Sequence, residues 1–211
     1  MTHGEAEEAR PRLPIPSRSG KATAGMIDLS GYYNTALDDN VHGKPGNTLS
    51  SLPKDIQGFG GTLFDVRGLI QLGGNNSAEI TGITFPKAVM EIPVHQRARH
   101  VHFLHAAAWH APVGTKIGEY VIHYDGGKSL AIALRYGLNT IDWWRSPEDE
   151  APAEVEVVWT GENERTRSLG IAIQLCRYTW DNPSPESAIE SIDFVSEVVA
   201  SAPLLVAVTI D

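Results

Sequence analysis

The sequence predicts an all-β protein, an antiparallel β-sandwich of the jelly-roll type. Short segments rich in β-branched and aromatic residues recur along most of the chain. Several of them, such as EYVIHY (119–124) and GIAIQL (170–175), alternate polar and apolar residues, which is the period of a strand with one buried face. Gly, Pro, Asn and Asp separate these segments at short intervals, as turns between strands require. Many short strands joined by polar turns favour a sandwich or a barrel.

The expected strands begin close to Met26, where Ile27, Leu29 and two tyrosines suit a first strand. A long polar loop is expected next, over residues 35–55, because Asp, Asn, Gly and Pro dominate it. The later strands are expected within 59–74, 78–94, 99–109, 117–127, 129–137, 153–161, 168–180, 187–197 and 203–211. Residues 185–199 are the only stretch with helical character, although IDFVS within it is more typical of a strand.

The first 25 residues have a different composition from the rest of the chain. They combine charges with Pro, Ser and Gly and contain no long apolar run, so they fit neither a signal peptide nor a packed segment. We therefore expect a flexible tail or linker over residues 1–25 and one β-sandwich domain over residues 26–211. No segment is apolar and long enough to suggest a membrane span.

The charge of the chain bears on its partners. The formal net charge is −9, whereas a protein that grips phosphate groups needs a basic surface. Nucleic acids and anionic membrane surfaces are therefore not expected as partners. The single cysteine, Cys176, rules out an internal disulfide.

A series of motifs gives the chain a family resemblance. They are FLH (103–105), YVIHYDGG (120–127), LRYGLNTIDWW (134–144), WTG (159–161), WDNPSPESAIESIDF (180–194) and PLLVAVT (203–209). In this order they resemble galactose-binding-like jelly-roll modules of secreted bacterial carbohydrate-active proteins. The resemblance implies an accessory domain linked to a catalytic domain in a parent protein, an extracellular or cell-envelope location, and a polysaccharide or oligosaccharide as ligand.

Four histidines lie in the short stretch HVHFLHAAAWH, residues 100–110. In a strand, His100 and His102 share one face, and His123 on the next strand is a candidate third ligand for zinc. No carboxylate lies nearby at a spacing suitable for a metal ligand, which argues against a metal site. We expect a central strand with Val101 and Phe103 in the core, and no tightly bound metal.

Tryptophans are the expected platform for a sugar, because an indole face suits the apolar side of a sugar ring while Asp, Asn and Arg bind its hydroxyl groups. If the segment is extended, Trp143 and Trp144 point to opposite faces, so at most one of them is expected to be free. Packing in the core is the alternative role for each tryptophan. We predict a glycan site on one rim from three loops, containing Trp109 and His110, then Asp142, Trp144 and Arg145, then Trp180, Asp181 and Asn182.

The carboxylates do not form a recognisable catalytic pattern, and no catalytic residue is assigned. No cofactor is expected, although the resemblance implies a structural calcium ion for which Asp28 and residues 37–40 offer oxygen ligands. The leading hypothesis is a non-catalytic carbohydrate-binding module. The alternatives are a glycan hydrolase or lyase with a histidine-centred site, at His102 or His123, and a structural spacer or protein-interaction module.

Overall fold

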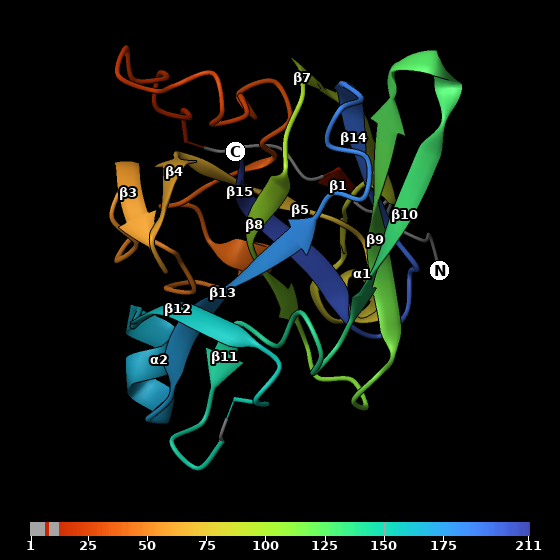
Figure 1. Cartoon of the computed structure of the whole chain (residues 1–211). Coiled ribbons are helices and arrows are strands. Elements are labelled where there is room, and N and C mark those ends of the chain that lie inside the picture. Colours follow the sequence, from red (N-terminus) through yellow and green to blue (C-terminus); the bar gives the residue numbers. More distant parts are fainter. Residues whose placement is uncertain (1–6, 9–12, 150) are drawn as a thin grey trace.

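Two antiparallel sheets face each other in the computed structural model, which describes residues 7–8, 13–149 and 151–211 (Figure 1). The smaller sheet has the strand order β10 (Ser129–Arg135), β9 (Lys116–Tyr124), β14 (Ile189–Ser196) and β7 (Ala88–Gln96). The larger sheet has the order β11 (Trp144–Arg145), β13 (Ala172–Asp181), β8 (His100–Ala108), β15 (Ala202–Ile210), β5 (Gly68–Gln71) and β2 (Thr35–Ala36), with β12 (Glu156–Gly161) also paired to β13. The prediction of an all-β sandwich is confirmed.

The chain crosses from one sheet to the other at most of the connections between the main strands. It passes from β5 to β7, back to β8, across to β9 and its hairpin partner β10, back to β13, across to β14 and back to β15. Each sheet therefore holds strands that are distant in sequence, and this crossing order is compatible with the predicted jelly roll.

The main core lies between the two sheets. Val101 and Phe103 of β8 are fully buried there, and the Phe103 ring stacks on Tyr120 of β9 with 3.8 Å between the ring centroids. His105 lies on the same face, as strand alternation requires, and its Nδ1 is 3.0 Å from the Tyr120 hydroxyl. Burial lowers the pKa of His105 to about 4, so this histidine is a neutral core residue. The expectation of a central strand is confirmed.

A second core covers the opposite face of the larger sheet. It is formed over Leu104, Leu175 and Val206 by the hairpin of β3 (Asp55–Phe59) and β4 (Thr62–Val66) together with residues 37–52. The expectation of a polar surface loop over residues 35–55 is therefore wrong in part, because its apolar side chains Leu37, Val41, Leu49 and Leu52 are buried. These apolar residues are too few among their polar neighbours for the sequence to show the period of a strand or a helix.

The helices were not foreseen. They are α1 (Asn75–Thr81), α2 (Glu164–Leu169) and two 3-10 turns, η1 (Val41–Gly43) and η2 (Asp125–Gly127). Each α-helix has about two turns, too few for an apolar period to be visible. The stretch with expected helical character contains strand β14 instead. In the described part of the chain, no helix is long and apolar enough to cross a membrane.

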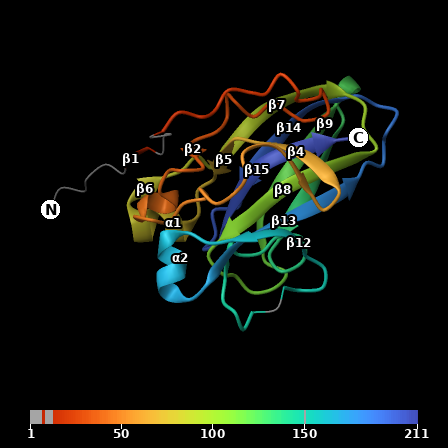
Figure 2. The ribbon, with the colours of Figure 1, turned by 90° about the vertical axis from the view of Figure 1, so that its left-hand side faces the viewer.

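Residues 13–25, which we expected to belong to a flexible tail or linker, contact the sandwich at two points. Arg18 forms an ion pair with Asp65 at 3.3 Å, and Ile15 packs against the main core. Figure 2 shows the segment running along the edge of the two layers. The domain boundary at residue 26 stays a prediction. Of the preceding ones, the structure describes only β1 (Glu7–Glu8), which pairs in parallel with β6 (Ile83–Thr84).

A buried ion pair anchors this edge of the fold. Arg67 and Asp65 are each only 2% exposed, and the Arg67 Nε donates to both oxygens of Asp65 at 2.9 and 3.0 Å. Arg67 also donates to Asp28 at 2.6 Å. Burial opposes ionisation of Asp28, but hydrogen bonds from Ser30 and Arg67 outweigh it and lower the pKa of Asp28 to about 2.

Replacing Arg67 with Met should lower the free energy of unfolding by about 3 kcal/mol, because Asp65 then loses most of its compensation while still buried. Lys54→Met is the matched control, since Lys54 pairs with Asp38 at the surface and should change stability by less than about 1 kcal/mol. Urea denaturation at pH 7 measures both. Equal losses in the two variants would contradict the assigned role of Arg67.

Candidate functional site

A cavity of about 230 Å³ lies at the end of the larger sheet where β8 ends. Three indoles line it, from Trp109, Trp143 and Trp144. The other walls come from η1 and the segments around it, from the end of α1 and from α2, and both helices lie at this end of the molecule (Figure 2). The remaining lining residues are His42, Lys44, Asn47, Ile80, Thr81, Ala108, Asp142 and Arg165.

Trp109 reaches the cavity because the strand stops there. It directly follows β8 and has a left-handed backbone conformation with φ of 65°, which turns the chain away from the sheet. Its ring lies 4.3 Å from that of His42, which is also left-handed, with φ of 54°. Non-glycine residues in this conformation are strained and gather at functional sites. Here two of them contact each other in one cavity.

Trp143 and Trp144 come from a segment that continues the sheet beside β8. The Trp143 amide donates to the Ala107 carbonyl at 2.8 Å. Trp143 is buried, whereas Trp144 is half-buried. Both indoles nevertheless line the same cavity, with 6.3 Å between their ring centroids. The Trp144 Nε1 donates to Asn47 Oδ1 at 3.2 Å, and the Arg165 guanidinium lies 5.9 Å from the centre of the Trp144 ring.

Two nitrogen atoms on residues that line the cavity lack partners. Within the described residues, neither His42 Nε2 nor Arg165 Nε has a hydrogen-bond partner, although both atoms are buried. Leaving a buried polar atom unpaired costs about 1–3 kcal/mol, so each such atom in a folded protein calls for an explanation. Burial lowers the pKa of His42 to about 3, which keeps its imidazole neutral.

Asp142 is the only carboxylate among the described residues that line the cavity. Its Oδ1 accepts a hydrogen bond from the Trp144 amide at 3.0 Å. Burial nevertheless raises the pKa of Asp142 to about 7. Near neutral pH this group therefore exists in both forms, as a carboxylate that accepts hydrogen bonds and as a carboxyl that can donate one.

The structure brings together only part of the predicted site. Trp109, Asp142 and Trp144 share the cavity, whereas Arg145 lines a separate hollow. The His110 ring contacts that of Tyr136, with 5.2 Å between the ring centroids.

The loop that begins at Trp180 lies at the opposite end of β8. Strand β13 pairs with β8 in antiparallel fashion, so Trp180 lies opposite Val101 and Asp181 opposite His100. This places them about 25–30 Å from Trp109 along the nine-residue strand. Asn182 is buried and accepts a hydrogen bond from the Tyr124 hydroxyl at 2.6 Å. The expectation that the three loops share one rim is therefore wrong.

The other predicted ligand sets are also separated. His123 lies on the smaller sheet, where its Nε2 contacts Asp193 at 2.7 Å, so it does not join His100 and His102. Of the residues suggested for calcium, Asp28 pairs with Arg67 and Asp38 pairs with Lys54, and the structural calcium ion stays a prediction.

Sequence reasoning missed most of the residues that line the cavity. His42, Asn47 and Arg165 come from segments without a recognisable motif, far from the tryptophans in the chain. The one local signal is the HGKPG turn at 42–46, whose glycines allow the left-handed backbone around His42.

No family model matches the chain, and no curated protein matches it. The resemblance to galactose-binding-like modules therefore stays a prediction.

Replacing Asp142 with Asn should stabilise the protein at high pH. Burial raises the pKa of Asp142 to about 7 in the folded protein, whereas an aspartate in the unfolded chain has a pKa of about 3.9. The contribution of Asp142 to the free energy of unfolding is therefore fully present below a pH of about 3.9 and is lost as the pH rises through about 7. The variant cannot ionise, so its advantage should grow from near zero at pH 4 to on the order of 2–4 kcal/mol at pH 8. Urea denaturation across this range tests the sign. Asp125→Asn, at an exposed position, is the control. If the free energy of unfolding of Asp142→Asn changes with pH in parallel with that of the parent, Asp142 does not titrate in this way.

Proposed function

We propose that the protein is a non-catalytic carbohydrate-binding module and that the indole-lined cavity is its ligand site. The observation that carries the proposal is the combination of three indole rings with the polar residues Asn47, Asp142 and Arg165 around one small cavity. An apolar wall with a few polar groups is the general composition of small-molecule sites.

The chemistry of the cavity matches that of a sugar. One side of a pyranose ring presents C–H groups, which pack on an indole face. Its hydroxyl groups both donate and accept hydrogen bonds. Arg165 and Lys44 supply donors, Asp142 and Asn47 supply acceptors, and the neutral ring of His42 can do either.

The size of the cavity indicates a short ligand segment and weak binding. Its volume of about 230 Å³ is below the range of about 300–1,000 Å³ typical of drug-sized ligands. One sugar unit fits this volume better than an oligosaccharide. Because few atoms are buried, we expect dissociation constants on the order of millimolar to micromolar.

The cavity favours binding over catalysis. Glycoside hydrolysis ordinarily needs two carboxyl groups facing the scissile bond, and Asp142 is the single one among the described lining residues. A lyase needs a competent base, whereas His42 has its pKa lowered to about 3 by burial and is a weak one.

The resemblance noted in the sequence supports the wider setting of the proposal. It suggests an accessory domain of a larger, secreted, glycan-active bacterial protein. The fold by itself does not establish such a role, so the cavity is the part of the proposal to test first.

Trp144→Ala and Arg165→Ala should each weaken retention on a bound polysaccharide by about tenfold or more, since each removes a wall of the site. A panel of insoluble polysaccharides and a glycan array, run with an assay for released sugar, identifies the ligand. Trp180→Ala is the matched control, because this half-buried indole lies at the other end of β13 and should leave binding unchanged.

Circular dichroism and thermal melting confirm that each variant is folded. If folded Trp144→Ala and Arg165→Ala bind like the parent, or if no glycan on the panel binds, the proposed site is wrong. Release of sugar that Asp142→Asn abolishes would replace the binding proposal with the hydrolase alternative.

A further inference from the structure

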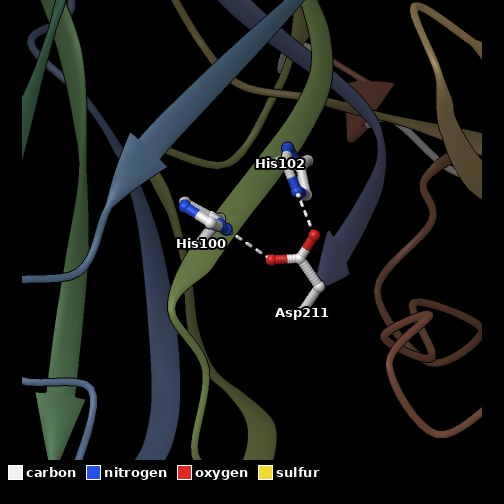
Figure 3. Close-up of side chains that lie close together, drawn as sticks. All are labelled: His100, His102 and Asp211. Carbon is white, nitrogen blue, oxygen red and sulfur yellow. Dashed lines mark hydrogen bonds and ion pairs between the residues drawn. The ribbon is translucent and has the colours of Figure 1, made fainter.

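A second cluster of functional side chains lies at the opposite end of β8 from the cavity. It contains His100, His102 and Asp211, whose ligand atoms all lie within 4.8 Å of one another. Figure 3 shows both imidazoles directed at the same carboxylate. His100 Nδ1 is 2.6 Å from Asp211 Oδ1, and His102 Nε2 is 3.3 Å from Asp211 Oδ2.

The fold holds these three residues in place through the backbone. His100 and His102 are two residues apart on one strand, so their side chains share a face. Asp211 directly follows β15, the neighbour of β8, and its amide donates to the His100 carbonyl at 3.2 Å. The amide of His100 in turn donates to the Asp211 carbonyl at 3.2 Å. The carboxylate is therefore fixed beside the histidine pair rather than carried on a free loop.

We propose that His100, His102 and Asp211 bind a zinc ion. Two imidazole nitrogens and one carboxylate oxygen are a common zinc ligand set in sites that keep a fourth position open. Bonds of 2.0–2.1 Å in a tetrahedral site place ligand atoms about 3.3 Å apart. The pair of His102 Nε2 and Asp211 Oδ2 already has this separation at 3.3 Å. The His100–Asp211 contact of 2.6 Å needs to open by about 0.7 Å.

The outer contact of His102 suits metal binding. His102 Nδ1 lies 2.9 Å from the Thr179 hydroxyl, which leaves Nε2 free to bind through its lone pair. A partner of this kind orients a metal-binding imidazole and fixes its tautomer. His100 Nε2 lies 3.7 Å from the exposed Asp181 carboxylate, which is beyond hydrogen-bond distance.

Other histidine–carboxylate pairs on the surface lack this arrangement. His95 contacts Glu190 at 2.9 Å and His123 contacts Asp193 at 2.7 Å, but neither belongs to a group of three such ligands among the described residues. The half-buried His100 and the exposed Asp211 leave the fourth position of the proposed site open to solvent. We therefore expect reversible binding with water as the fourth ligand.

Titration calorimetry with zinc chloride tests the site on the full chain, purified without a polyhistidine tag and stripped with a chelator. We expect one zinc ion per chain, and a loss of affinity of at least a hundredfold in His102→Ala and in Asp211→Asn. His95→Ala is the matched control, since it removes an exposed histidine with a carboxylate partner and should leave zinc affinity unchanged.

A second variant separates a built site from adventitious binding to surface histidines. Thr179→Val keeps all three ligands but removes the hydroxyl that orients His102, and should weaken zinc binding by about 10–100-fold.

Cobalt provides a spectroscopic check, because a tetrahedral site gives strong visible absorption. The proposal is overturned if the parent binds no zinc, if folded Asp211→Asn binds zinc like the parent, or if His95→Ala lowers the affinity as much as His102→Ala. The result is independent of glycan binding, because the cavity lies at the other end of β8.

Discussion

The pairing of β8 with β15 is the interaction on which the rest of the structure depends. The nine residues of β15 are all buried, and β8 is buried from its second residue to its last. Such strands are stable only if both faces are covered, because burial of apolar side chains is the main driving force of folding. The smaller sheet covers one face. The β3–β4 hairpin and the segment 37–52 cover the other, which is why so much irregular chain is ordered here.

The two candidate sites follow from the ends of this pair of strands. Trp109 directly follows the last residue of β8, and His100 is the first residue of β8, so one strand supports a site at each end. A rigid strand fixes the direction of the side chains at its ends, whereas loops from other parts of the chain bring the partners. In the cavity these partners are His42, Asn47 and Arg165. At the other end they are Asp211 and Thr179.

The four histidines of residues 100–110 have different environments despite their closeness in the chain. His105 faces the core and is bound to Tyr120, whereas His100 and His102 face the opposite side beside Asp211. His110 lies beyond the strand and contacts Tyr136. Alternation along the strand separates the first three. A count of histidines in a sequence is therefore a poor guide to a metal site, because the direction of each side chain decides.

The sequence by itself determined the fold class and the burial of Val101 and Phe103, because these depend on local patterns of polar and apolar residues. Only the tertiary structure decided which residues meet. The antiparallel pairing of β13 with β8 took Trp180 to the far end of the molecule, and the pairing of β15 with β8 brought Asp211, more than a hundred residues away in the chain, to His102. Contacts of this range arise from strand order and register across the sheet, and no local pattern in the sequence encodes them.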